Sequence, residues 1–396
     1  MICLSLQVTR IKGIPIRLHF TLIVVFFLIL WTLATRFMPQ LYPNLSQIDY
    51  WIMGAAGALI LFISVLLHEL AHSLVAIRYG LKVRQIILFI FGGVSEIEEE
   101  KEETIEDFRK EFKIAVVGPI TSFIIASIFA SIWWFFSQIG MGLEEGATVI
   151  QQITVGVLFY GALVNTLLGA FNLIPAFPLD GGRILRSALL RWKKDYDQAT
   201  KIAVKVGIWI SYGFMGFGFL SILGGAFLGG IWLILIGWFL NSGAQSYLYQ
   251  REITSVLSGV RLRDIMNTRV ISVTEGTKVD ELLRNYFNIY MKSAFPVLNS
   301  QGELLGMVNL KEVMDVPENK RHDGKVEEIM TPRSNLIILT PDRKADEALM
   351  QMTRRHMGKV FVCSGGERKL LGLVSKTDIM NVATERQEYA QASKRS

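Results

Sequence analysis

Two histidines and a glutamate lie inside an apolar segment that is long enough to cross a membrane. The sequence His68-Glu-Leu-Ala-His72 falls within the apolar run of residues 52–77. An ionisable side chain at mid-bilayer costs roughly 3 kcal/mol on insertion scales, so such groups are rare and usually functional. Only five histidines occur in 396 residues. This pattern therefore indicates a metal site, and the alternative, two histidines that merely pack between helices, would require a coincidence.

The spacing of these residues suits zinc chemistry. His68 and His72 are four residues apart, so on a helix they share one face and can both aim a ring nitrogen at one metal ion. Glu69 follows about 100° further round the helix. Its carboxylate is thereby placed beside the metal, where a general base for an attacking water is needed.

Composition divides the chain into a membrane part and a soluble part. Phe, Leu, Ile, Trp and Gly dominate residues 18–250, whereas residues 261–396 have an ordinary soluble composition. We expect a membrane domain over 1–250 and a linker over 251–260. Apolar runs of spanning length predict about six transmembrane helices. They lie near residues 18–35, 52–77, 114–136, 152–174, 206–222 and 227–245.

Positive charges orient the predicted helices. Residues 78–113 contain seven Lys or Arg, as do residues 183–205, whereas 137–151 and 221–230 contain none. Because Lys and Arg accumulate on the cytoplasmic side, both termini should be cytoplasmic. The formal charge of +6 is then a topology signal and does not indicate nucleic-acid binding. With two cysteines, a disulfide framework is excluded.

Asp180 is the best candidate for a third metal ligand. It follows Pro175 and Pro178 at the end of the fourth run, where the prolines should loosen the helix. His68 lies ten residues before Arg78, about 15 Å along a helix and so near mid-membrane. Asp180 can reach that depth only if its segment is not helical, or if His68 lies shallower. The alternative is a helix-end carboxylate before a Gly-Gly turn.

These motifs resemble the site-2 protease family of intramembrane zinc metalloproteases, over about residues 8–245. The resemblance implies that His68, His72 and Asp180 bind one zinc ion per chain, and that Glu69 activates water. It also implies that Asn172 contacts the substrate backbone. The residues that carry the resemblance are His68, Glu69, His72, Asn172, Pro175, Leu179, Asp180 and Gly181, with Gly92-Gly93 and Gly118-Pro119 in support.

Residues 84–94 are β-favouring around the Gly92-Gly93 turn signal, and the segment is too short to span a membrane. We expect a re-entrant β-hairpin that includes Gly92 and Gly93 and whose edge pairs with an unwound substrate by β-augmentation. An interfacial loop packed on the helices is the alternative.

The soluble part contains an internal repeat. Asp264-Ile-Met266 recurs as Glu328-Ile-Met330, and Leu305-Gly-Met-Val308 as Leu371-Gly-Leu-Val374. Each copy reads as an extended start, a helix, two strands joined by a turn and a closing helix. The region resembles a tandem cystathionine-β-synthase (CBS) domain pair, with repeats over 261–320 and 321–386 and a polar tail over 387–396.

The CBS resemblance implies binding of an adenine nucleotide, ATP, ADP or AMP. The family's Ser/Thr-x-x-Asp pattern is present in the second copy as Ser375, Thr377 and Asp378. In the first copy it is altered to Asn309-Leu-Lys-Glu312, so we expect one nucleotide site at most. A structural or dimerising role is the alternative, and we expect a homodimer formed through the CBS pair or the membrane domain.

The sequence thus predicts a polytopic α-helical membrane domain followed by a cytoplasmic α/β tandem CBS module. The expected function is zinc-dependent cleavage of a transmembrane segment of a membrane-anchored substrate, that is, regulated intramembrane proteolysis, under control of the CBS pair. The alternative is an ion transporter with a CBS regulatory module, in which His68, His72 and Asp180 form the transport site. Glu69 separates the two hypotheses, because hydrolysis requires a base beside the metal.

Overall fold

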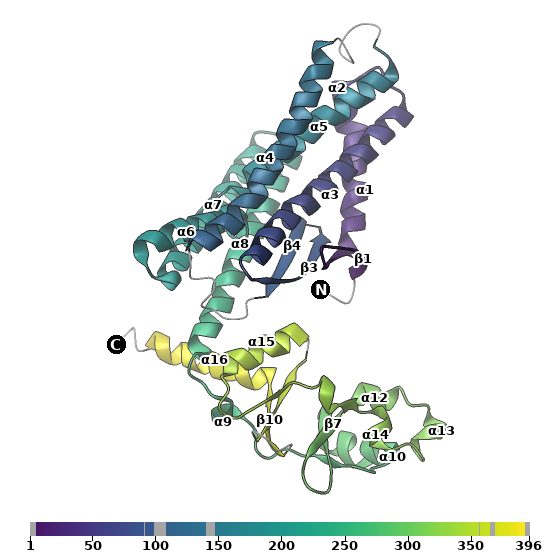
Figure 1. Ribbon diagram of the computed structural model, residues 1–396, viewed down its shortest axis with the longest axis vertical. Helices are drawn as coiled ribbons and strands as arrows, with labels where there is room; N and C mark the ends of the chain where they lie inside the picture. Colours follow the sequence, from purple (N-terminus) through teal and green to yellow (C-terminus); the bar gives the residue numbers. More distant parts are fainter. Residues whose placement is uncertain are drawn as a thin grey trace. The chain divides into compact units, whose positions relative to one another are not determined.

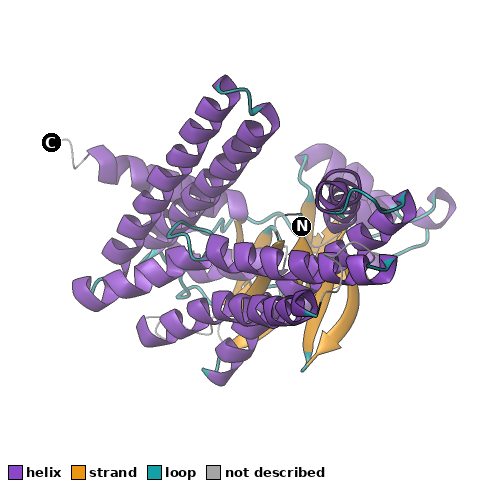
Figure 2. Ribbon diagram, turned by 90° about the horizontal axis from the view of Figure 1, so that it is seen from above, coloured by secondary structure: helices purple, strands orange, loops and turns teal. Residues whose placement is uncertain are grey.

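The chain divides into two compact units, Met1–Leu248 and Tyr249–Ser396. The computed structural model describes residues 5–90, 92–98, 108–139, 147–355, 357–364 and 369–392. Helices dominate the first unit, whereas the second mixes short helices and strands (Figure 1). Figure 2 shows the helices in purple and the strands in orange.

Six helical segments among the described residues are long and apolar enough to cross a membrane, which confirms the six predicted spans. The protein is therefore a multi-pass membrane protein. The first segment, Thr21–Leu41, comprises α1 (Thr21–Thr32), a π-helical turn (Leu33–Phe37) and α2 (Met38–Leu41). The others are α3 (Gln47–Arg78), α4 (Phe108–Gln138), α5 (Val149–Asn172), α7 (Tyr196–Leu223) and α8 (Phe227–Leu257).

Two of these helices begin with side-chain caps, and apolar side chains cover their outer surfaces. Ser46 and Asp49 form a reciprocal capping box at the start of α3, as Thr148 and Gln151 do at α5, and these side chains bond backbone N–H groups that the first turn leaves unpaired. Large apolar side chains point outward, where lipid rather than water surrounds them. Examples are Trp31, Trp134 and Trp232.

A four-stranded sheet packs against α3 near one end of the helices (Figure 1). The strands are β1 (Ser5–Ile11), β2 (Ile14–His19), β3 (Lys82–Phe89) and β4 (Gly92–Glu98), in the order β1-β2-β3-β4. β3 and β4 pair antiparallel, so the predicted hairpin is confirmed. Gly92 and Gly93 belong to β4 rather than to the turn, and pair with Phe89 and Leu88. β4 is an edge strand of this sheet.

The hairpin of β1 and β2 is a structural element that the sequence analysis did not predict. Its turn has Lys12 at φ 49° and Gly13 at φ 83°, which is the backbone that two-residue hairpin turns favour. The alternation of apolar Leu6 and Val8 with polar Gln7 and Thr9 was the available signal. β2 pairs parallel with β3, so this hairpin extends the sheet on the side away from β4.

The chain between α5 and α6 is not helical, as the two prolines predicted. α5 ends at Asn172, and α6 (Asp180–Lys193) begins at Asp180. Gly181 and Gly182 lie in the first turn of α6 and do not form a turn of their own. A Cβ on Gly181 would stand 2.2 Å from the Ile174 carbonyl oxygen, so glycine lets α6 begin directly against the preceding backbone.

The second unit contains two copies of one motif, as the repeat predicted. In the first, β5 (Val273–Thr274) pairs parallel with β6 (Ala294–Leu298), which pairs antiparallel with β7 (Leu304–Asn309). In the second, β9 (Ile338–Leu339) pairs parallel with β10 (Lys359–Cys363), which pairs antiparallel with β11 (Leu370–Ser375). A helical segment precedes the hairpin in each copy and another follows it. The remaining elements are α9 (Leu262–Ile265), α10 (Val279–Glu281), a π-helical turn (Leu282–Phe287), α11 (Asn288–Tyr290), α12 (Leu310–Met314), α13 (Glu318–Arg321), α14 (Val326–Ile329), β8 (Thr331–Pro332), a 3-10 turn (Arg333–Asn335), α15 (Ala345–Arg355) and α16 (Lys376–Ala392).

The linker expected over residues 251–260 is not a separate segment. α8 continues to Leu257, and Ile253, Leu257 and Val260 are buried in the apolar core around α15, β10 and α16.

Candidate metal centre

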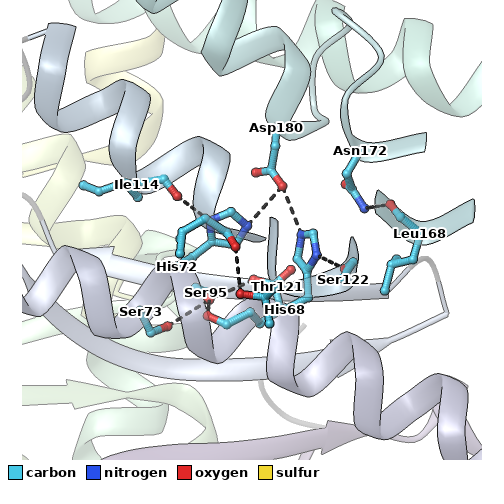
Figure 3. A network of polar contacts seen from close by, with 12 residues as sticks. His68, His72, Ser73, Ser95, Ile114, Thr121, Ser122, Leu168, Asn172 and Asp180 are labelled. Carbon is cyan, nitrogen blue, oxygen red and sulfur yellow. Dashed lines mark hydrogen bonds and ion pairs between the residues drawn. The ribbon is translucent and has the colours of Figure 1, made fainter. Parts of the chain in front are cut away.

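Three ionisable side chains from two helices converge inside the membrane unit (Figure 3). The Nε2 atoms of His68 and His72, on α3, each lie 3.0 Å from Asp180 Oδ2 at the start of α6. The exposed fractions of the three residues are 3 %, 3 % and 9 %. The predicted third ligand therefore meets the histidines, and the non-helical chain after α5 is what brings it there.

The second ring nitrogen of each histidine is bonded to α4. His68 Nδ1 is 2.9 Å from Ser122 Oγ, and His72 Nδ1 donates to the Ile114 carbonyl oxygen at 2.6 Å. Such bonds on the far side of the ring fix the tautomer and the orientation of a metal-binding imidazole. They leave both Nε2 atoms directed toward Asp180.

Gly118 of α4 leaves space beside the two Nε2 atoms. A Cβ at this position would stand 2.1 Å from His72 Nε2 and 2.6 Å from His68 Nε2. The first separation is close to a zinc–nitrogen bond length of about 2.0–2.1 Å, and the second is longer. A side chain here would occupy the place of a metal ion, so the glycine of the Gly118-Pro119 pair has a local physical reason.

Glu69 is beside the cluster but is held by a different partner. Ser95 of β4 donates to Glu69 Oε2 at 2.8 Å, and Ser73 Oγ lies 3.1 Å from Ser95 Oγ. Gly93 makes room for this carboxylate, since a Cβ there would stand 2.3 Å from Glu69 Cγ. The base predicted from the sequence is thus positioned by the edge strand of the sheet.

The donor set fits zinc. One ligand atom from each of His68, His72 and Asp180 lies within 4.8 Å of the others, and the three form a metal-capable group among the described residues. Two imidazoles and one carboxylate, with a fourth position open, are the protein ligands of several catalytic zinc sites.

Sequence comparison identifies the family. The profile of peptidase family M50 matches residues 56–214, and the CBS domain profile matches 262–319 and 326–385. A zinc metalloprotease of Methanocaldococcus jannaschii is 32% identical over 376 residues, which are 95% of this chain and 95% of its own. The chain belongs to peptidase family M50. It is a membrane zinc metalloendopeptidase of the site-2 protease type with a tandem CBS module.

Two further similarities concern a second sequence relative and a solved structure. Rip3 of Mycobacterium tuberculosis is 29% identical over 376 residues, 95% of this M50 protein and 92% of its own length. A solved structure of a site-2 protease from Methanocaldococcus jannaschii is 34% identical, covering 61% of this chain and 94% of that one, with a TM-score of 0.41.

The remaining predicted site residues lie outside the cluster. The Asn172 amide donates to the Leu168 carbonyl oxygen of its own helix at 2.9 Å (Figure 3). Gly92 begins β4. In the CBS module, Ser375 and Asp378 form a reciprocal cap at the start of α16, with Ser375 Oγ 2.7 Å from Asp378 Oδ2, and Thr377 is exposed.

The altered motif of the first CBS copy has the same local structure. Asn309 and Glu312 form a capping box at α12. Ser-x-x-Asp and Asn-x-x-Glu are therefore equivalent as helix caps, which explains why both copies keep an oxygen at the first position and a carboxylate at the fourth. Sequence reasoning missed Ser95, Ser122 and the Ile114 carbonyl, which are 26 or more residues from their partners in the chain.

Proposed function

We propose that this M50 protein cleaves a transmembrane segment of a membrane-anchored protein, with zinc held by His68, His72 and Asp180 and with Glu69 as the general base. The observation that carries the proposal is the convergence of these three side chains beside Glu69, on a helix that is long and apolar enough to span a membrane. When bound, zinc polarises the scissile carbonyl and lowers the pKa of a water to about 7.

The residues of the chain supply the other requirements. Glu69 accepts a proton from the attacking water and returns it to the leaving amine. Ser95 fixes one oxygen of that carboxylate, and Ser122 and Ile114 hold the imidazoles. The ion-transporter alternative gains no support, because Glu69 is bonded to Ser95 and is not part of the ligand group.

The test is reconstitution of the purified protein with a single-span substrate, comparing wild type with Glu69→Gln while zinc content is measured. We expect cleavage by wild type alone and equal zinc in both. Equal cleavage by Glu69→Gln would refute the base role. A wild type without stoichiometric zinc would refute the metal site.

We further propose that the substrate pairs with the outer edge of β4. A substrate helix buries its carbonyls in i to i+4 bonds, so it must unwind before attack, and an edge strand can accept the unwound chain. β4 carries the serine that bonds Glu69, and among the described residues no strand pairs with its outer edge, which supports this site of entry. Val94→Pro should raise KM strongly and Val94→Thr should not; equal KM values would contradict the pairing.

We propose that an adenine nucleotide at the CBS pair modulates cleavage. Lys359 supports an anion site, since its ammonium is half-buried and lies 3.4 Å from both Ser293 Oγ and the Ala294 carbonyl oxygen of the other repeat. Burial, together with Lys292, lowers the pKa of Lys359, and a phosphate would stabilise the charged form.

Calorimetric titration of the full-length protein with ATP tests this regulation. We expect heat from wild type, weaker binding by Lys359→Met and by Asp378→Ala, and a changed cleavage rate when ATP is added. Absence of heat from wild type would exclude the nucleotide. The CBS pair would then have a structural role, and light scattering of the solubilised protein would test the expected homodimer.

The orientation is also a proposal. The basic residues after α3 and around α6 support cytoplasmic termini. Labelling of single cysteines at residues 5 and 392 by an impermeant reagent in spheroplasts tests it. Protection of both until the membrane is opened is the expected result, and labelling of either in intact spheroplasts would contradict it.

A further inference from the structure

A buried arginine lies between the helices that build the metal centre. Arg186 is on α6, six residues after Asp180, and is 4 % exposed. Its Nε donates to Glu111 Oε1 of α4 at 2.8 Å, and Glu111 is 3 % exposed. The guanidinium also donates to the Tyr247 hydroxyl of α8.

Aromatic rings enclose the same guanidinium. Its carbon lies 5.2 Å from the ring centre of Phe177, 4.9 Å from that of Tyr196 and 5.4 Å from that of Tyr247. Phe177 belongs to the non-helical chain that leads into Asp180. A guanidinium can both stack on rings and donate in a planar fork, and lysine cannot do both. One side chain thus joins α4, α6, α7, α8 and the segment before Asp180.

Stability alone is a poor explanation of this ion pair. Moving two charges from water into a protein interior is unfavourable, and apolar replacement of a buried pair is often neutral or stabilising. Glu111 Oε2 adds to the cost, because it is buried and has no hydrogen-bond partner within the described ranges. The pair therefore needs a role in geometry.

The position of Glu111 on α4 supplies that role. It is three residues, less than one helical turn, before Ile114, whose carbonyl oxygen orients His72. The same helix carries Ser122, which orients His68. Arg186 therefore connects the helix that bears the third ligand to the helix that orients the other two.

We infer that Arg186 is a positioning residue, which through Glu111 and Phe177 sets Asp180 at the correct place relative to His68 and His72 before metal binds. The inference rests on the proposed zinc site. Mutation of a residue that orients a metal ligand typically weakens metal affinity 10–100-fold. A site whose ligands are already in place binds its metal without having to order them.

The experiment compares Arg186→Met, Glu111→Gln and the double variant in the full-length solubilised protein. Zinc affinity is measured by competition with a chromophoric chelator, and ligand geometry by the visible spectrum of the Co²⁺-substituted protein. Arg191→Met, at an exposed position on the same helix, is the control. Thermal denaturation of the metal-free protein reports stability separately.

We expect Arg186→Met to lose stability and to bind zinc about 10–100-fold more weakly. The double variant should recover most of the stability, because neither charge is left unpaired. It should keep the weak zinc affinity and an altered Co²⁺ spectrum. The control should match wild type in every measurement.

Recovery of both stability and zinc affinity in the double variant would overturn the inference, since Arg186 would then act only in folding. If Arg186→Met does not fold, Tyr247→Phe and Glu111→Gln test the proposal instead, because each weakens one contact of Arg186. An unchanged Co²⁺ spectrum in both variants would contradict the proposal. Failure of the zinc site itself is a separate result: wild type would bind no stoichiometric zinc, or His72→Ala would bind it as wild type does.

Discussion

Gly118→Ala should remove zinc binding while leaving the fold in place. The new Cβ would stand 2.1 Å from His72 Nε2 and 2.6 Å from His68 Nε2. Ordinary carbon contacts lie near 3.5–4.0 Å, so the nearer ring must move by about 1.4 Å or more. His72 cannot easily move, because its Nδ1 is bonded to the Ile114 carbonyl at 2.6 Å.

The magnitude follows from this displacement. A shift of more than 1 Å exceeds the roughly 0.2 Å tolerance of a metal–ligand distance, so at least one ligand is lost. We expect zinc affinity to fall at least 100-fold, beyond the 10–100-fold effect of an outer partner. Overpacking should cost about 1–3 kcal/mol of stability.

The assay is chelator competition for zinc together with cleavage of a single-span substrate. Two glycine variants serve as controls. Gly156→Ala is also crowded, at 2.3 Å from Met53 Cε, but is away from the metal ligands, whereas Gly213→Ala has no atom within 4 Å. Gly156→Ala should lose stability and keep zinc, and Gly213→Ala should keep both. Zinc affinity of Gly118→Ala within threefold of wild type would refute this reasoning.

Three further substitutions separate the parts of the site. Glu69→Gln should retain zinc and lower kcat by about 10²–10⁴, the usual contribution of a general base, and a matching loss of zinc would contradict its role. Ser95→Ala should lower kcat with zinc affinity unchanged, and Ser95→Thr, which keeps the hydroxyl, should restore much of the rate. Steady-state kinetics on one substrate measures both variants. Equally low kcat values for the two would show that the hydroxyl of Ser95 does not position Glu69. Ser122→Ala should weaken zinc binding about 10–100-fold through His68, and chelator competition showing wild-type affinity would exclude that contribution.

Much of the fold was readable from the sequence because its signals are local. A membrane-spanning helix is specified by about 20 successive apolar residues, and all six were found. The CBS repeat was recognisable because two copies of one short motif lie in the same chain. The β1–β2 hairpin was missed although Leu6, Val8 and the Lys12-Gly13 turn carried a weak signal, and α8 extends into the range expected as a linker.

The cluster of His68, His72 and Asp180 was also predictable, for a different reason. His68, Glu69 and His72 are close in sequence, and helix periodicity alone places them on neighbouring faces. Asp180 was predictable from the prolines that precede it. Its approach to the histidines required a non-helical segment, and the structure contains that segment between Asn172 and Asp180.

The sequence by itself determined which side chains can bind a metal, because residue type and helical spacing are properties of the chain. Only the tertiary structure decided what holds them. Ser95 on Glu69, Ser122 on His68 and Arg186 on Glu111 join residues that are 26, 54 and 75 positions apart. No periodicity links such positions, since their proximity arises from the packing of α3, α4, α6 and β4 and exists only once all four have come together.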